Sequence, residues 1–149
     1  MKLKRVEIYT DGACTNNPGP GGWGTVLLFG DHSSEYKGFT PHSTNQKMEL
    51  TAAIEGLSKL KEACEVSVYS DSAYLVNAFN QNWLENWLKR GWINAKREPV
   101  SNRDLWERLL ALSRIHTIKW IKVKGHSDNK WNNRCDQLAR DAIKEGLKR

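Results

Sequence analysis

The chain has 149 residues, of which 39% are hydrophobic and 27% charged, a composition that fits a globular protein and excludes a disordered one. No apolar run approaches the roughly 20 residues that a membrane-spanning helix needs. Lys and Arg outnumber Asp and Glu by 23 to 17, and the net charge of +6 favours an anionic partner such as nucleic acid or a membrane surface.

The first part of the sequence predicts three strands followed by a long helix. Residues 1–10 pass from basic residues directly into a β-type alternation and lack the apolar core of a signal peptide. Strands are predicted over residues 4–11, 21–30 and 33–40, the last two joined by a hairpin turn within "GDHSS". A helix is predicted over residues 43–63, where Ser43 and Gln46 make a capping box. Its apolar residues recur at helical spacing: Leu50, Ala53, Ile54, Leu57 and Leu60.

The remaining sequence predicts two strands and four helices. Residues 66–71 and 117–123 alternate as strands. Ser101 and Asp104 make a second capping box, which opens a helix over residues 102–114. A closing helix is marked by Cys135, Leu138, Ala139, Ala142, Ile143 and Leu147.

The predicted order of elements is β-β-β-α-β-α-α-α-β-α. Three strands joined by tight turns form an antiparallel meander, and strands separated by helices pair in parallel through right-handed crossovers. We therefore expect an α/β fold with a mixed five-stranded sheet and helices on both faces. With no linker or internal repeat, residues 1–149 are expected to form a single domain.

The cysteines indicate the compartment. Cys14, Cys64 and Cys135 are odd in number and widely separated, with no CxxC pair. This pattern predicts reduced thiols in the cytoplasm rather than a disulfide framework or a zinc site.

A repeated Tyr-x-Asp draws attention to the ends of two predicted strands. One strand ends at Asp11 and another at Asp71. If these strands are parallel neighbours, the two aspartates meet at one edge of the sheet, where sites lie in open α/β folds. Glu49 and Asp136, each near the start of a helix, would join them if both helices begin near that edge. Taken singly, each of these carboxylates is equally explained as a turn, capping or solvated helix residue.

Four clustered carboxylates repel one another, so without a cation some members would hold protons. Hard oxygen ligands suit Mg²⁺, or Mn²⁺ in its place. Two such ions about 3.5–4 Å apart can activate water and stabilise the leaving oxygen of a phosphodiester.

Five motifs occur in order along the chain: "YTDGACTNNPGPGGWG", "TNQKMELTAAIEGL", "VYSDSAYLVNAF", "VKGHSDN" and "NRCDQLARDA". Over nearly its full length the chain thereby resembles a bacterial type 1 ribonuclease H, of the ribonuclease HI family. The resemblance implies a metal-dependent endonuclease that cuts the RNA strand of RNA–DNA hybrids and leaves 5′-phosphate and 3′-hydroxyl ends. It places Asp11, Glu49, Asp71 and Asp136 on the family's metal-binding carboxylates.

His126 matches the histidine of the family's mobile loop. Because an unperturbed imidazole titrates near pH ~6.5, this side chain is suited to pass a proton to the attacking water or the leaving group.

Two positions depart from the family's usual pattern. Asn133 stands where Glu is frequent, which affects metal affinity or product release, and Ala73 stands where Gln often contacts the minor groove.

Residues 83–97, "WLENWLKRGWINAKR", combine tryptophans with basic residues. Cations neutralise phosphates and flat rings pack on sugars or bases, so this composition suits a nucleic-acid surface. The spacing of Trp83 and Trp87 fits the buried face of an amphipathic helix equally well. By resemblance, the segment is the family's basic protrusion, at about residues 83–99, which binds the DNA strand through Trp83, Trp87, Lys89, Arg90, Lys96 and Arg97.

Selection of RNA over DNA requires contact with the 2′-hydroxyl in the wide minor groove. By resemblance, Cys14, Asn17, Asn45 and Gln46 line that groove, and Thr44 and Asn102 grip phosphates of the DNA strand. Several of these positions also have a plainer interpretation. The stretch "NNPGPGG" is a typical hairpin loop, Asn45 is an early helix residue, and both Thr44 and Asn102 could cap helices.

Two other classes of function remain in view. A non-catalytic hybrid- or DNA-binding module on the same fold would gain affinity by losing its carboxylates, yet all four are present. A related strand-transfer or junction-cutting nuclease usually needs partner domains for which 149 residues leave no room. A phosphatase of the haloacid dehalogenase type would need Asp at the position of Ala13. We expect a monomer whose partner is a hybrid duplex and not a membrane.

Overall fold

The computed structural model describes residues 2–125 and 128–148. Its sheet has the strand order β3-β2-β1-β4-β5. β1 pairs antiparallel with β2, and β2 with β3, whereas β4 is parallel to both β1 and β5. The predicted order of elements and the mixed sheet are thus confirmed. The strands span Lys4–Cys14, Gly19–Phe29, His32–Ser43, Cys64–Ser70 and Thr117–Lys122.

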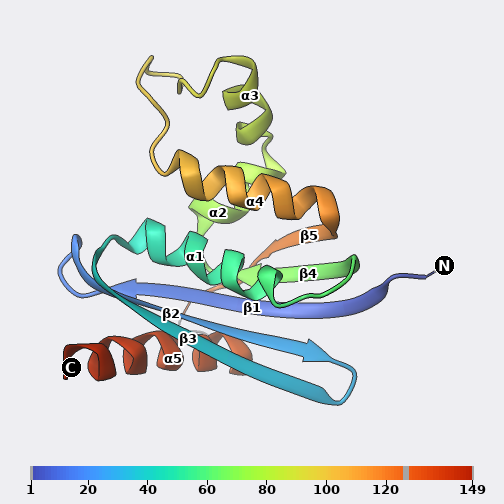
Figure 1. Ribbon diagram of the computed structural model, residues 1–149, viewed down its shortest axis with the longest axis vertical. Helices are drawn as coiled ribbons and strands as arrows, with labels where there is room; N and C mark the ends of the chain where they lie inside the picture. Colours follow the sequence, from blue (N-terminus) through green and yellow to red (C-terminus); the bar gives the residue numbers. More distant parts are fainter. Residues whose placement is uncertain (1, 126–127, 149) are drawn as a thin grey trace.

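Helices cover both faces of the sheet, as expected. α5 lies on one face, while α1, α2 and α4 lie on the other (Figure 1). α3 and the segment after it extend away from the sheet beyond α4 (Figure 1). None of the helices within the described residues is long and apolar enough to cross a membrane. The helices span Asn45–Ser58, Ala73–Asn80, Trp83–Lys89, Arg103–Ile115 and Lys130–Leu147.

The main core lies between the sheet and the helices α1, α2 and α4. Strand alternation sends Val66 and Val68 of β4 into this core, while Ser67 and Tyr69 face the opposite side. A smaller cluster of Val26, Cys135 and Leu138 lies beneath α5. Packing in these two clusters fixes the positions of β1, α1, β4 and α5, which carry or directly precede the four acidic residues.

The start and end of α1 differ from the prediction. Ser43 remains in β3, where it pairs with Gly19, so Thr44 is the N-cap and accepts a hydrogen bond from Lys47 N at 3.1 Å. The expected Ser43–Gln46 capping box is therefore wrong. The helix ends at Ser58 rather than at residue 63, and Leu60 packs against the core from the turn that follows.

The start of α4 also differs. The expected Ser101–Asp104 capping box does not form, because Asn102 occupies the N-cap position with a left-handed φ of 61° and makes no capping bond. Its side-chain Nδ2 donates instead to Tyr74 Oη at 3.3 Å. A tertiary contact thus sets the beginning of α4. At the other end of the chain, Leu147 closes α5 but is exposed.

Candidate active site

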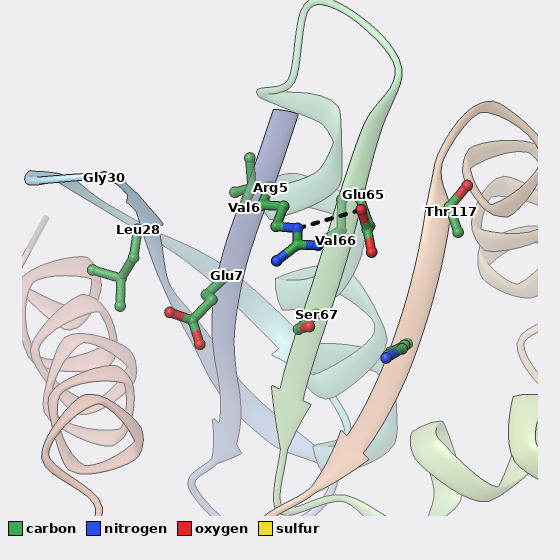
Figure 2. A pocket seen from close by; sticks show the side chains of 10 residues that line it. Arg5, Val6, Glu7, Leu28, Gly30, Glu65, Val66, Ser67 and Thr117 are labelled. Atoms are coloured by element: carbon green, nitrogen blue, oxygen red, sulfur yellow. Dashed lines mark ion pairs between the residues drawn. The ribbon is translucent and has the colours of Figure 1, made fainter. Parts of the chain in front are cut away.

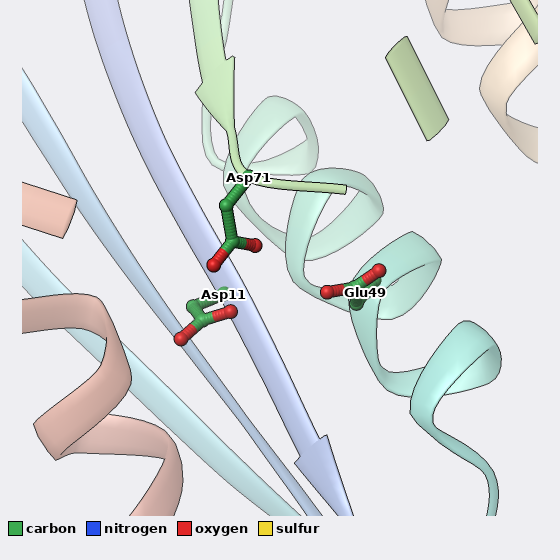
Figure 3. Close-up of side chains that lie close together, drawn as sticks. All are labelled: Asp11, Glu49 and Asp71. Atoms are coloured by element: carbon green, nitrogen blue, oxygen red, sulfur yellow. The ribbon is translucent and has the colours of Figure 1, made fainter. Parts of the chain in front are cut away.

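The parallel register of β1 and β4 explains the repeated Tyr-x-Asp. Tyr9 pairs with Tyr69, and their rings stack with centroids 4.4 Å apart. Asp11 and Asp71 each lie two residues beyond this pair, so the two strands bring them side by side. Asp71 directly follows β4, as expected, but the expected strand end at Asp11 is wrong, because β1 continues to Cys14 through its pairing with β2. The adjacent positions of Asp11 and Asp71 are drawn in Figure 3.

Glu49 reaches these aspartates from α1 because Gly12 permits a close approach of helix and strand. A Cβ atom at Gly12 would lie 2.4 Å from Glu49 N, so any other residue would force the helix away. Carboxylate oxygens of Asp11, Glu49 and Asp71 all lie within 4.8 Å of one another (Figure 3). Three elements therefore supply one compact acidic group.

Asp136 lies at the edge of this group. It lines the same cavity as the three other carboxylates but is not among the oxygens within 4.8 Å of one another. Its Oδ2 atom forms an ion pair of 2.9 Å with Arg140 Nη2, one turn further along α5. The cavity has a volume of about 240 Å³ and is lined by Asp11, Gly12, Ala13, Cys14, Asn45, Glu49, Asp71, Asn132, Asn133 and Asp136.

Burial and mutual repulsion disfavour charge on this group. Burial, and then the charges of Asp71, Glu49 and Asp136, raise the pKa of Asp11 from 3.8 to about 8. Burial is also the main cause that raises the pKa of Glu49 from 4.5 to about 7, against a lowering hydrogen bond from Ser72. Oxygen ligands arranged at such a cost suit a hard divalent cation, which would remove the repulsion.

His126 lies outside the described residues. Its neighbour Gly125 lies close to Asp71, since a Cβ atom there would be 2.8 Å from Asp71 Oδ2. The segment that leads to His126 therefore passes beside the acidic group.

Several residues predicted to contact substrate gather at the same edge. Cys14 and Asn45 line the acidic cavity, and Asn17 Oδ1 accepts a hydrogen bond from Asn45 N at 3.1 Å. Thr44 caps α1, as its plainer interpretation predicted, and Gln46 is exposed in the first turn of that helix. Ala73, at the start of α2, is exposed as well.

The tryptophans of the predicted protrusion pack inward, as the interpretation as a buried helix face predicted, and nucleic-acid binding by this segment stays a prediction. Trp83 and Trp87 are half-buried and pack against the main core, while Trp92 is buried beneath the guanidinium of Arg103, 5.2 Å from its ring centroid. A cavity of about 370 Å³ is lined in part by Trp83, Trp87 and Arg90. The four basic side chains of the prediction are exposed: Lys89, Arg90, Lys96 and Arg97.

Sequence reasoning assigned no role to Asn132. This residue is 2% exposed, lines the acidic cavity, and has a side-chain Oδ1 atom without a hydrogen-bond partner. An unsatisfied buried acceptor of this kind costs about 1–3 kcal/mol. Its spacing of four residues from Asp136 was the available signal, because such positions share one face of a helix.

A larger cavity of about 550 Å³ lies elsewhere, on the face of the sheet formed by β1, β4 and β5 (Figure 2). Two of its charged groups, Arg5 and Glu65, form an ion pair of 3.6 Å. Glu7, also in its lining, accepts a hydrogen bond from Tyr69 Oη at 3.0 Å. The acidic cavity, where carboxylates from three elements converge within 4.8 Å, is therefore the better candidate for a catalytic centre.

Comparison with known proteins finds relatives of similar length. The chain is 59% identical to a ribonuclease H of Symbiobacterium thermophilum over 97% of this chain and 98% of the relative. It is also 59% identical to a ribonuclease H of Acetivibrio thermocellus over 99% of this chain and the whole of that relative.

Solved structures share the fold. The N-terminal RNase H domain of a Mycobacterium tuberculosis protein superposes with a TM-score of 0.75 at 27% identity, and the match covers 97% of each chain. LC11-RNase H1, solved in complex with an RNA/DNA hybrid, gives a TM-score of 0.73 at 23% identity over 95% of this chain and 99% of that one. The sequence model of the family described as RNase H matches residues 3–144, and the chain therefore belongs to the RNase H family of enzymes.

Proposed function

We propose that this protein is a metal-dependent endonuclease that hydrolyses the RNA strand of RNA–DNA hybrids and leaves 5′-phosphate and 3′-hydroxyl ends. The observation that carries the proposal is the group formed by Asp11, Glu49 and Asp71, whose carboxylate oxygens lie within 4.8 Å of one another. Membership of the RNase H family supports the reaction. LC11-RNase H1, a structural neighbour solved with a hybrid, supports the substrate.

Mg²⁺, or Mn²⁺ in its place, fits the acidic group because all its charged ligands are hard oxygens. Asp11, Glu49 and Asp71 would hold the metal, with Asp136 at the edge of the cavity as a further ligand. Bound as a pair, such ions would supply an activated water and stabilise the leaving oxygen. The acidic cavity, with a volume of about 240 Å³, would receive the phosphodiester.

His126 would move the proton in this reaction. An imidazole of ordinary pKa, about 6.5, can accept a proton from the attacking water or return one to the leaving oxygen near neutral pH. The position of Gly125 supports this role, because Gly125 directly precedes His126 in the chain and lies beside Asp71.

Recognition of RNA would depend on groups next to the cavity. Cys14, Asn17, Asn45 and Gln46 are proposed to line the minor groove, where the 2′-hydroxyl distinguishes RNA from DNA. The position of Cys14 and Asn45 in the lining of the acidic cavity supports this, since the cut strand must lie there. Thr44 and Asn102 are proposed to contact phosphates of the DNA strand.

We further propose that residues 1–149 work as one monomeric domain in the cytoplasm, with a protrusion at about residues 83–99 that binds the DNA strand. The exposure of Lys89, Arg90, Lys96 and Arg97 supports this role, because phosphates bind exposed cations. The half-buried Trp83 and Trp87 would offer ring edges beside those cations. The three free cysteines are consistent with a reducing compartment.

The test uses one labelled RNA strand, presented as a hybrid with DNA, as duplex RNA and alone, with Mg²⁺ or with EDTA. We expect cleavage of the hybrid only, only with metal, and loss of cleavage with retained binding in Asp11→Asn. Treatment of the products with a 5′-phosphate-dependent exonuclease would identify the ends. Tight hybrid binding without cleavage under any metal would instead favour the non-catalytic binding module, and wild-type cleavage by Asp11→Asn would refute the assigned metal site.

A further inference from the structure

The amide of Asn132 is held at the edge of the acidic cavity by the start of α5. Asn132 is the third residue of the helix, and its backbone N–H donates to Asn129 Oδ1 at 3.0 Å, which caps the helix. Its side chain is almost fully buried. The first turn of α5 therefore fixes this amide where it lines the cavity.

The side-chain oxygen of Asn132 receives no hydrogen bond from the described residues. Within the part of the chain that the structure describes, Asn132 Oδ1 is the buried side-chain atom without a hydrogen-bond partner. Asp11, Glu49, Asp71 and Asp136, which line the same cavity, carry oxygens that act only as acceptors once ionised. A buried acceptor that has no donor and lies beside these carboxylates is costly unless a cation, or a water molecule bound to one, enters the cavity.

We propose that Asn132 is a positioning residue for the metal site, and that its Oδ1 accepts a hydrogen bond from a water molecule of the cation held by the carboxylates. The inference rests on the proposed function, since it assumes that the cavity binds a divalent cation. Mg²⁺ usually retains several of its waters in protein sites, and these waters are donors directed outward. A fixed acceptor in the cavity wall then orients one of them, as groups behind the ligands of other metal sites do.

A purely structural role makes a different prediction. If Asn132 served only the packing of α5, its replacement would lower the free energy of unfolding without changing affinity for the metal. In the proposed role, Asn132→Leu removes an unsatisfied acceptor from the metal-free protein, so the metal-free variant loses little or no stability. The substitution then destabilises the metal-bound state instead, by weakening the binding of the metal.

The experiment measures Mg²⁺ binding to the substrate-free protein at pH 8, by calorimetric titration and by the rise in Tm with Mg²⁺ concentration. We expect Asn132→Leu to raise the Kd for Mg²⁺ about tenfold. Asn132→Asp keeps an acceptor oxygen of the same shape and is expected to bind Mg²⁺ at least as tightly as the wild type. Thr25→Val is the matched control, because it removes a buried hydroxyl that donates to Ala52 O at 2.8 Å away from the cavity. It should lower Tm and leave the Kd unchanged.

Two results would overturn the inference. One is an unchanged Kd in Asn132→Leu. The other is weaker Mg²⁺ binding in Asn132→Asp, which would assign the role to the amide N–H instead. The aspartate variant can be measured even if the leucine variant does not fold. Failure of the proposed function is distinguishable, because then the wild type would not bind Mg²⁺ or Asp11→Asn would bind it equally well.

Discussion

The electrostatic cost of the acidic group can be measured with Asp11→Asn in the metal-free protein. This substitution keeps the shape of the side chain and removes its charge. A carboxyl group whose pKa is higher in the folded than in the unfolded state favours folding at low pH, and this advantage is lost as the pH rises. For Asp11 the loss extends from about pH 4 to about pH 8, since its pKa is raised from 3.8 to about 8. Asp11→Asn should therefore stabilise the metal-free protein most above pH 8.

The size of the effect follows from the same pKa values. A difference of about 4 pH units corresponds to at most about 6 kcal/mol, at about 1.4 kcal/mol per unit. Rotation of the side chains and entry of water relieve much of this repulsion, so we expect a gain in the free energy of unfolding of about 2 kcal/mol at pH 8.5. For a chain of this length, such a gain corresponds to a rise in Tm of roughly 6 °C.

Thermal unfolding in EDTA at pH 5, 7 and 8.5 provides the measurement. The matched control is Asp31→Asn, because Asp31 is exposed in the turn between β2 and β3 and should change Tm little at any pH. Added Mg²⁺ should then raise the Tm of the wild type more than that of Asp11→Asn. The reasoning would be refuted if Asp11→Asn were no more stable than the wild type at pH 8.5, or if its gain were the same at pH 5.

Three further predictions concern other parts of the molecule. Gly12→Ala places a Cβ 2.4 Å from Glu49 N, so α1 must shift. We expect a loss of stability of about 1–3 kcal/mol and weaker Mg²⁺ binding, measured by unfolding and by titration; unchanged Mg²⁺ affinity would contradict the close-approach argument. Burial lowers the pKa of His116, whose Nδ1 accepts from Cys64 N at 3.1 Å. The imidazole of His116 therefore takes up a proton more readily in the unfolded state, so the free energy of unfolding should fall as the pH drops below about 6.5. His116→Gln should weaken this pH dependence, measured by unfolding curves from pH 7 to pH 5. Neutralising the four cations of the protrusion should raise KM and reduce the slope of log KM against log salt by up to about 3 with little change in kcat. A salt series of hybrid cleavage measures this slope for the variant with Lys89, Arg90, Lys96 and Arg97 replaced by Ala.

The sheet and the meeting of two aspartates could be predicted from the sequence because both depend on local patterns. Alternation located the strands, and the shared Tyr-x-Asp marked equivalent positions on β1 and β4, which the register from Lys4 to Tyr9 then aligns. The helix starts could not be predicted in the same way. Ser43 and Thr44 are both good caps, and the strand pairing of Ser43 with Gly19 decides between them.

The role of Gly12 and the isolation of Asn132 also lay beyond the sequence. A glycine next to an aspartate in a strand has many explanations, and only the packing of α1 identifies Gly12 as the point of close approach. An asparagine at the start of a helix is equally ordinary. Its unpaired oxygen becomes visible only when the groups around it, contributed by β1, α1 and the end of β4, are in place.

The tryptophans of the protrusion pack against the core, as one of the two interpretations of this segment predicted. Trp87 lies edge-on to Trp106, with ring centroids 5.6 Å apart and planes at 62°. Trp106 is fully buried and contacts Tyr74 in the same edge-on manner, at 5.1 Å. A chain of aromatic contacts thus joins α3 to the main core. Lys89 at the end of α3 therefore stands on a helix that the core holds in place. If nucleic acid binds there, as we propose, the entropy of ordering that helix is not subtracted from its affinity.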